Sequence, residues 1–193
     1  ELQEYFYILW ENRAKRVGHR EDVAFELLNE VTEPSYIDAW NRIAGECIRR
    51  VRAIAPETVI LVGSYHNNHA TALGELNIPM DDRIVYNFHC YDPLPFTHQG
   101  AYWTKFTDLR MAYDESGCDQ GMFEYLFAPA LSKAQKDNTI LYCGAYGVID
   151  IVAPEEALKW FRDIHAVFEK YGIGRAVWSY QKMDFGLTDA RLD

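Results

Sequence analysis

The feature that most constrains the fold is a regular alternation of short, apolar, β-branched segments with longer amphipathic ones. The segment 58–63 (TVILVG) is apolar almost throughout, and further strand-like segments occupy 23–28, 83–88, 139–144 and 174–179. Strands this apolar are typical of parallel sheets that are covered on both faces. No tight-turn sequence joins neighbouring strands, so we expect helical crossovers between them.

Helical periodicity fills the intervals between the strands. The predicted helices cover residues 1–17, 34–54, 69–76, 122–136 and 154–171, and a long loop is expected over 91–120. Five apolar side chains share one face of the first helix, namely Leu2, Tyr5, Phe6, Leu9 and Trp10. This pattern predicts a buried face. We expect a single domain over 1–193, built either as an open doubly wound sheet or as part of a (β/α)8 barrel. No glycine-rich phosphate loop opens a helix, which disfavours a nucleotide-binding sheet.

Charge and cysteine content exclude several classes of function. The chain carries 29 Asp and Glu against 19 Lys and Arg, a formal net charge of −10. This balance argues against binding to nucleic acid or to an anionic membrane surface, and no apolar run is long enough to span a membrane. The four cysteines form no CxxC pair and are expected to be free thiols, although their spacing leaves one disulfide open. We expect no metal and no cofactor.

Polar and aromatic residues gather where the predicted strands end. They are Asn29 and Glu30, His89 and Tyr91, Ala145 with its neighbours, and Trp178. The carboxyl ends of parallel strands meet at one rim, where barrel enzymes build their active sites. Each residue alone has a structural alternative, since Glu30 could be a solvated loop residue and Trp178 a packing residue. Their common position favours a site. Glu26, inside an apolar strand, is expected to be a structural carboxylate.

Three further residues are candidate contacts for a ligand. His98 and Trp103 lie in the loop that follows the His89 strand, and Asn67 follows the 58–63 strand. The alternative for the loop is that it packs on itself. Aromatic residues make up 15% of the chain, more than a core of this size requires. Flat apolar ligands such as sugars are one outlet for them.

The segments FELLNE (25–30), NFHCY (87–91) and CGAYG (143–147), followed by Trp178, resemble glycoside hydrolase family 5 in order and spacing. This family comprises cellulase-like retaining hydrolases with (β/α)8 barrels. The resemblance implies that Glu30 is the general acid/base and that Asn29 binds the sugar 2-hydroxyl.

The same resemblance assigns the other residues of the site. His89 and Tyr91 would line it, with Tyr91 close to the nucleophile, and Trp178 would form the floor under the sugar at the cleavage point. The implied partner is a β-1,4-glucan oligosaccharide or polysaccharide cleaved by an endoglucanase. Mannan and xyloglucan are alternatives within the family.

Two departures from the family pattern matter. Where the pattern Cys-Gly-Glu-Tyr-Gly has its nucleophilic Glu, this chain has Ala145, so no covalent glycosyl-enzyme can form. We interpret Ala145 as an engineered replacement that inactivates the enzyme. The alternative is a catalytically dead carbohydrate-binding member of the family.

The second departure is length. A (β/α)8 barrel needs about 250 residues, and this chain is expected to supply only about strands four to eight. We expect the missing units to come from a longer polypeptide or from another chain. Because polymeric glycans are too large to import, secretion is expected, with a cytoplasmic location as the alternative.

Overall fold

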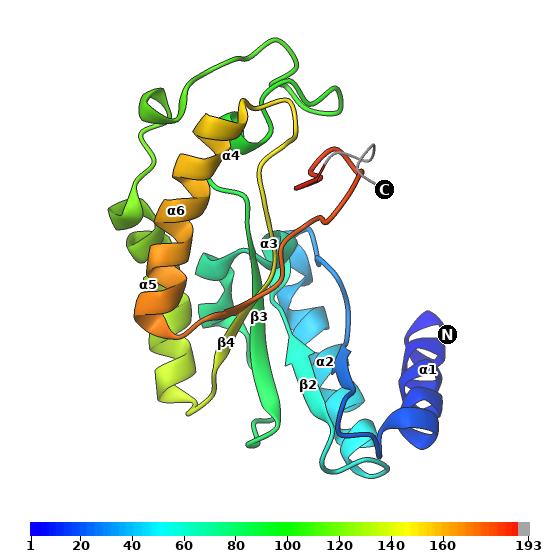
Figure 1. Ribbon diagram of the computed structural model, residues 1–193. Coiled ribbons are helices and arrows are strands. Elements are labelled where there is room, and N and C mark those ends of the chain that lie inside the picture. Colours follow the sequence, from blue (N-terminus) through cyan, green and yellow to red (C-terminus); the bar gives the residue numbers. More distant parts are fainter. Residues whose placement is uncertain (189–193) are drawn as a thin grey trace. The chain divides into compact units, whose positions relative to one another are not determined.

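A computed structural model describes residues 1–188 of the chain. Five strands form one sheet in the order β1-β2-β3-β4-β5, and Figure 1 labels the three central strands, β2, β3 and β4. They are β1 (Ala24–Glu26), β2 (Val59–Val62), β3 (Ile84–Cys90), β4 (Leu141–Tyr146) and β5 (Gly174–Arg175). β1 pairs in parallel with β2, and β2 in parallel with β3. Strands that follow one another in the sequence are therefore neighbours in the sheet and run parallel. This arrangement confirms the expected α/β fold, in which helices return the chain between strands.

The helices follow the predicted order with shifted ends. They are α1 (Leu2–Val17), α2 (Ile37–Arg52), α3 (Tyr65–Asn68), α4 (Leu94–Thr97), α5 (Gln120–Lys136) and α6 (Pro154–Tyr171), with 3-10 turns at Pro34–Tyr36, Ala70–Glu75 and Tyr113–Glu115. α6 has the predicted bounds, since Pro154 opens it and Gly172 ends it in the left-handed conformation. The helix expected over 69–76 is a 3-10 turn, and the expected loop 91–120 contains α4. β5 is shorter than 174–179 because the chain turns back after it, with the Ser179 N–H donating to the Phe185 carbonyl.

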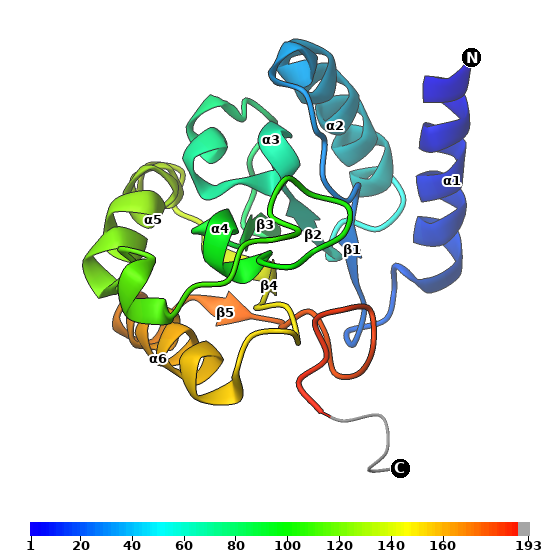
Figure 2. The ribbon, with the colours of Figure 1, turned by 90° about the horizontal axis from the view of Figure 1, so that it is seen from above.

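The chain divides into two compact units. Unit 1 comprises Glu1–Phe88 and Pro129–Tyr142, and unit 2 comprises His89–Ala128 and the described residues from Cys143 onward. In unit 1, α1 and α2 lie side by side (Figure 2). α2 buries one apolar stripe, formed by Trp40, Ala44, Cys47, Ile48 and Val51. The Trp40 indole Nε1 donates to the Gly63 carbonyl at 2.8 Å, which ties α2 to the end of β2.

The prediction for α1 is only half right. Phe6 packs edge-on against Trp40, and Trp10 lies 5.2 Å from the Phe25 ring. Leu2, Tyr5 and Leu9, expected on the same buried face, are instead exposed. The reason is that α2 is the main neighbour of α1 and covers only one side of it.

The core of unit 2 is largely aromatic. The Phe127 and Phe168 rings stack in parallel with their centroids 5.8 Å apart. Trp160 is completely buried, and its Nε1 donates to the Asp92 carbonyl at 2.8 Å. Much of the aromatic content therefore serves packing in unit 2, which the composition alone could not separate from ligand binding.

All four cysteines are buried and free, which confirms the expected thiols. Burial raises the pKa of the Cys47 thiol to about 12 and also raises the pKa of the Cys143 thiol. Thiols with such a raised pKa are poor nucleophiles at neutral pH. Among the described residues, no helix has the length and apolar character that crossing a bilayer requires.

Candidate active site

Glu30 lies in the loop that follows β1 in unit 1. β1 ends at Glu26, so Asn29 and Glu30 come three and four residues beyond the strand and not directly after it. Asn29 is exposed and Glu30 is half-buried. Glu30 has a φ of 46°, a left-handed conformation that turns the chain sharply.

Asn67 reaches Glu30 from the turn that follows β2. Its side-chain Nδ2 donates to Glu30 Oε2 at 3.1 Å. The backbone of the turn is bound to the Glu30 loop as well, because the Asn67 N–H donates to the Val31 carbonyl at 3.0 Å and the His66 N–H to that of Thr32 at 3.2 Å. The structure thus brings together two of the predicted site residues, Glu30 and Asn67.

Glu26 has the structural role that its place in the strand predicted. Its Oε1 accepts a hydrogen bond of 2.8 Å from Nδ2 of Asn87, a fully buried residue of β3. This bond links side chains on two strands of unit 1. Glu26 therefore bridges strands with its carboxylate.

In unit 2, three rings cluster beyond the end of β3. Tyr91 lies 5.4 Å from His98 and 5.5 Å from Phe185, and His98 lies 5.1 Å from Phe185, each measured between ring centroids. The Thr97 hydroxyl donates to the Tyr91 carbonyl, which fixes the backbone under the cluster. His89, within β3, is buried. Phe185 is not among the predicted site residues, because nothing in the local sequence pattern distinguishes it from other loop residues.

Ala145 and Trp178 lie close together on the backbone of unit 2. Ala145 is buried within β4. The carbonyl of Tyr146, the residue after Ala145, accepts the Trp178 N–H at 3.0 Å. The Trp178 side chain remains 45% exposed. Gly147 makes this approach possible, because a Cβ on it would collide with the Trp178 carbonyl.

Trp103 lies in the loop that follows α4. It is 46% exposed and packs edge-on against Tyr102 with the centroids 4.7 Å apart. The loop is closed by the Gly100 N–H donating to the Phe106 carbonyl at 2.8 Å. Trp103 is therefore held on the surface with its ring available for a ligand.

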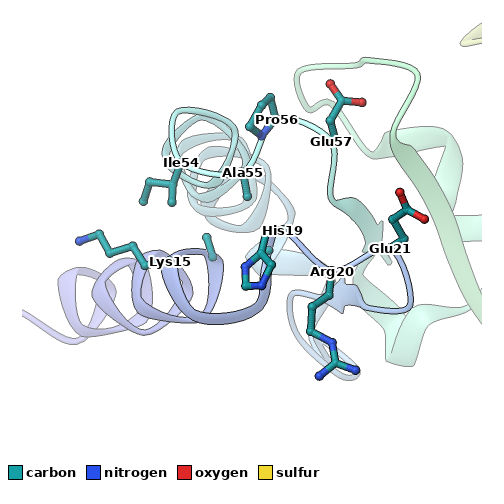
Figure 3. A pocket seen from close by; sticks show the side chains of 10 residues that line it. Lys15, His19, Arg20, Glu21, Ile54, Ala55, Pro56 and Glu57 are labelled. Carbon is teal, nitrogen blue, oxygen red and sulfur yellow. The ribbon is translucent and has the colours of Figure 1, made fainter.

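A pocket of about 370 Å³ lies at the other end of the strands of unit 1. Figure 3 shows Lys15 and His19 from the end of α1 on one side, and Ile54, Ala55 and Pro56 from the end of α2 on the other. The residues that line this pocket come before β1 and β2 in the sequence, at the amino ends of these strands. Glu30 comes after β1, at its carboxyl end. Side chains at the amino ends of barrel strands serve stability more often than chemistry. The part of the chain that the structure describes contains no cluster of His, Cys, Asp or Glu suited to a metal ion.

Comparison with known proteins identifies the family. The model described as cellulase (glycosyl hydrolase family 5) matches residues 1–184. The chain belongs to glycoside hydrolase family 5. Cellodextrinase A from Ruminococcus flavefaciens is 56% identical over 178 residues, which cover 91% of this chain and 53% of that protein. Endoglucanase C from Acetivibrio thermocellus is 37% identical, over 95% of this chain and 61% of its own length.

Solved structures of family 5 enzymes have the same fold. Thermotoga maritima Cel5A in complex with cellobiose matches with a TM-score of 0.84 and 26% identity, over 97% of this chain and 62% of that one. This family 5 chain therefore has the fold of part of a TIM barrel, and it spans between about half and two thirds of the length of these relatives.

Proposed function

We propose that the protein binds and, with a complete active site, hydrolyses β-1,4-linked glucan by the retaining mechanism, with Glu30 as general acid/base. The observation that carries the proposal is Glu30 itself, a half-buried carboxylate in the loop after β1 whose side chain is held by Asn67. The cellodextrinase and endoglucanase activities named for the relatives support the choice of a glucan.

The retaining reaction needs two carboxylates about 5 Å apart. One attacks the anomeric carbon while the other protonates the leaving oxygen, and the second then deprotonates the water that releases the sugar. In this proposal Glu30 performs both proton transfers. Asn29 binds the 2-hydroxyl, His89 and Tyr91 line the site, and Trp178 offers its exposed ring to the apolar face of the sugar.

Position 145 belongs to the nucleophile in this assignment. A methyl group cannot attack the anomeric carbon, so the chain with Ala145 is proposed to bind oligosaccharide and to turn it over poorly or not at all. Ala145 is buried within β4. The backbone on either side of it is hydrogen-bonded, because the carbonyls of Cys143 and Tyr146 accept backbone N–H groups. A carboxylate restored there would be held by the strand.

The rest of the barrel is proposed to come from a further segment of polypeptide. Its contact surface on unit 1 would include Leu2, Tyr5 and Leu9 of α1, which are exposed, and β1, which forms one edge of the sheet. An edge strand of this kind pairs readily with another strand. We also propose that the protein acts outside the cell, where polymeric glycan is found.

Binding of three oligosaccharides tests the substrate class. Calorimetric titration with cellotetraose, mannotetraose and a xyloglucan oligosaccharide should give the tightest binding with cellotetraose. Stronger binding of either of the other two would move the assignment to a mannanase or a xyloglucanase. If none of the three bound to the folded intact protein, the proposed function would be wrong.

A further inference from the structure

The contact between Asn67 and Glu30 assigns Asn67 a role different from sugar binding. This inference rests on the proposed function of Glu30. The Asn67 amide is exposed, as a sugar contact would be, yet its Nδ2 already donates to Glu30 Oε2 at 3.1 Å. Because this N–H donor is already engaged by Glu30, Asn67 is placed to orient the Glu30 carboxyl group.

The turn that carries Asn67 has an unusual backbone. Three successive residues, His66, Asn67 and Asn68, have φ values of 57°, 56° and 57°. Only Gly, Asn, Asp and His adopt this left-handed region with any frequency, and the sequence places a His and two Asn there. The residue types therefore match the conformation that directs the Asn67 side chain toward Glu30.

Buried contacts hold the turn from behind. Asn68 is 1% exposed, and its amide lies so close to Gly63 that a Cβ on Gly63 would collide with it. The Gly63 carbonyl in turn accepts the Trp40 indole N–H at 2.8 Å. The turn that carries Asn67 is thus packed, through Asn68 and Gly63, against the core of α2, in addition to its backbone bonds to the Glu30 loop.

We propose that Asn67 is a positioning residue that fixes the Glu30 carboxyl group by donating to Oε2. The lone pair of Oε2 that accepts the Asn67 N–H cannot also hold the acid proton. Oε1 is therefore the oxygen that carries the proton destined for the leaving group. The same bond stabilises the ionised carboxylate more than the neutral acid, because an N–H donor binds a charged acceptor more strongly than a neutral one.

Other titratable groups lie on the same segments of unit 1. They are Glu26, Glu33, Tyr65, His66 and His69. Glu26 is engaged by Asn87, and the Tyr65 hydroxyl donates to Glu75 at 2.5 Å. The His66 ring lies 5.2 Å from that of His69. The side chain of Asn67 donates from this turn to the Glu30 carboxylate, so a substitution at Asn67 tests that bond most directly.

A carbon-13 NMR titration of the Glu carboxyl carbons in this chain tests the proposal, with the Glu30 signal assigned by its loss in Glu30→Gln. In Asn67→Gly the left-handed backbone is kept and the donor is removed, so the pKa of Glu30 should rise by about one pH unit. Asn67→Asp keeps the side-chain size and replaces the donor with a negative charge, and it should raise the pKa at least as much. Asn138→Gly is the matched control, because Asn138 is also a left-handed Asn of unit 1 (φ 52°), and it should leave the Glu30 pKa unchanged.

An unchanged Glu30 pKa in both Asn67 variants would overturn the proposal, and so would an equal rise in the control. The titration needs no turnover, so its outcome is separate from that of the proposed function. A raised pKa in a protein that binds no glucan would refute the function and leave the Asn67–Glu30 coupling standing.

Discussion

Replacing Trp178 with alanine should weaken oligosaccharide binding about tenfold. Trp178 exposes 45% of its surface, and because a Trp side chain presents roughly 250 Å², about 110 Å² is open to a ligand. At about 25 cal/mol per Å² this area is worth at most about 2.8 kcal/mol. A sugar ring covers only one face of the indole, so about half, ~1.4 kcal/mol, is expected, and this corresponds to a tenfold change in Kd.

Isothermal titration of cellotetraose into the protein with Ala145 measures this change without interference from turnover. The matched control is Tyr125→Ala, which removes an aromatic ring that is 80% exposed on α5 and is not among the candidate site residues. The control should bind with unchanged Kd. If Trp178→Ala bound cellotetraose as tightly as the parent while keeping its circular dichroism spectrum, Trp178 would not be the sugar floor.

Two further predictions concern stability. Burial lowers the pKa of His165 below 6.5, with a smaller contribution from the charge of Arg175, so the folded state binds protons less readily than the unfolded state. The stability that neutral His165 contributes is complete above pH 6.5 and is lost as the pH falls below that value. Thermal melts from pH 7 to pH 5 should therefore show a shallower decline of Tm in His165→Gln than in the parent. An identical decline of Tm in both proteins would contradict the assignment. Gly147→Ala should cost about 1–3 kcal/mol in urea denaturation, because its Cβ would collide with the Trp178 carbonyl. Gly74→Ala, where no atom lies within 4 Å of the new Cβ, should cost less than about 0.5 kcal/mol, and equal losses would refute the steric argument.

The fold was predictable because the signals that specify it are local and repeated. Apolar β-branched segments such as 58–63 alternate with helical periodicity, and the parallel sheet follows from that alternation. The burial of α1 was not predictable to the same degree. An apolar stripe indicates that a face can be covered, but it does not say how much of it a neighbour covers, and α2 leaves Leu2 and Tyr5 exposed.

The residues of the candidate site stay a prediction from the sequence, and the structure adds geometry that the sequence pattern does not contain. The sequence pattern placed Glu30, Ala145 and Trp178 at strand ends, whereas the structure has Glu30 four residues beyond β1, Ala145 within β4 and Trp178 three residues beyond β5. The bond from Asn67 to Glu30 depends on a left-handed turn that no periodicity describes. Phe185 joins the ring cluster only because the chain turns back after Trp178, and such a return depends on tertiary packing that the sequence pattern does not encode.

A carboxylate restored at position 145 should return hydrolytic activity if this position belongs to the nucleophile. The measurement is the release of reducing sugar from cellotetraose by the intact protein with Ala145→Glu, compared with the parent and with the double variant Ala145→Glu, Glu30→Gln. We expect Ala145→Glu to raise the hydrolysis rate by about 10⁴-fold or more, and the added Glu30→Gln change to remove most of this gain. A folded Ala145→Glu protein that hydrolyses neither cellotetraose nor mannotetraose nor xyloglucan would contradict the assignment of position 145 as the nucleophile.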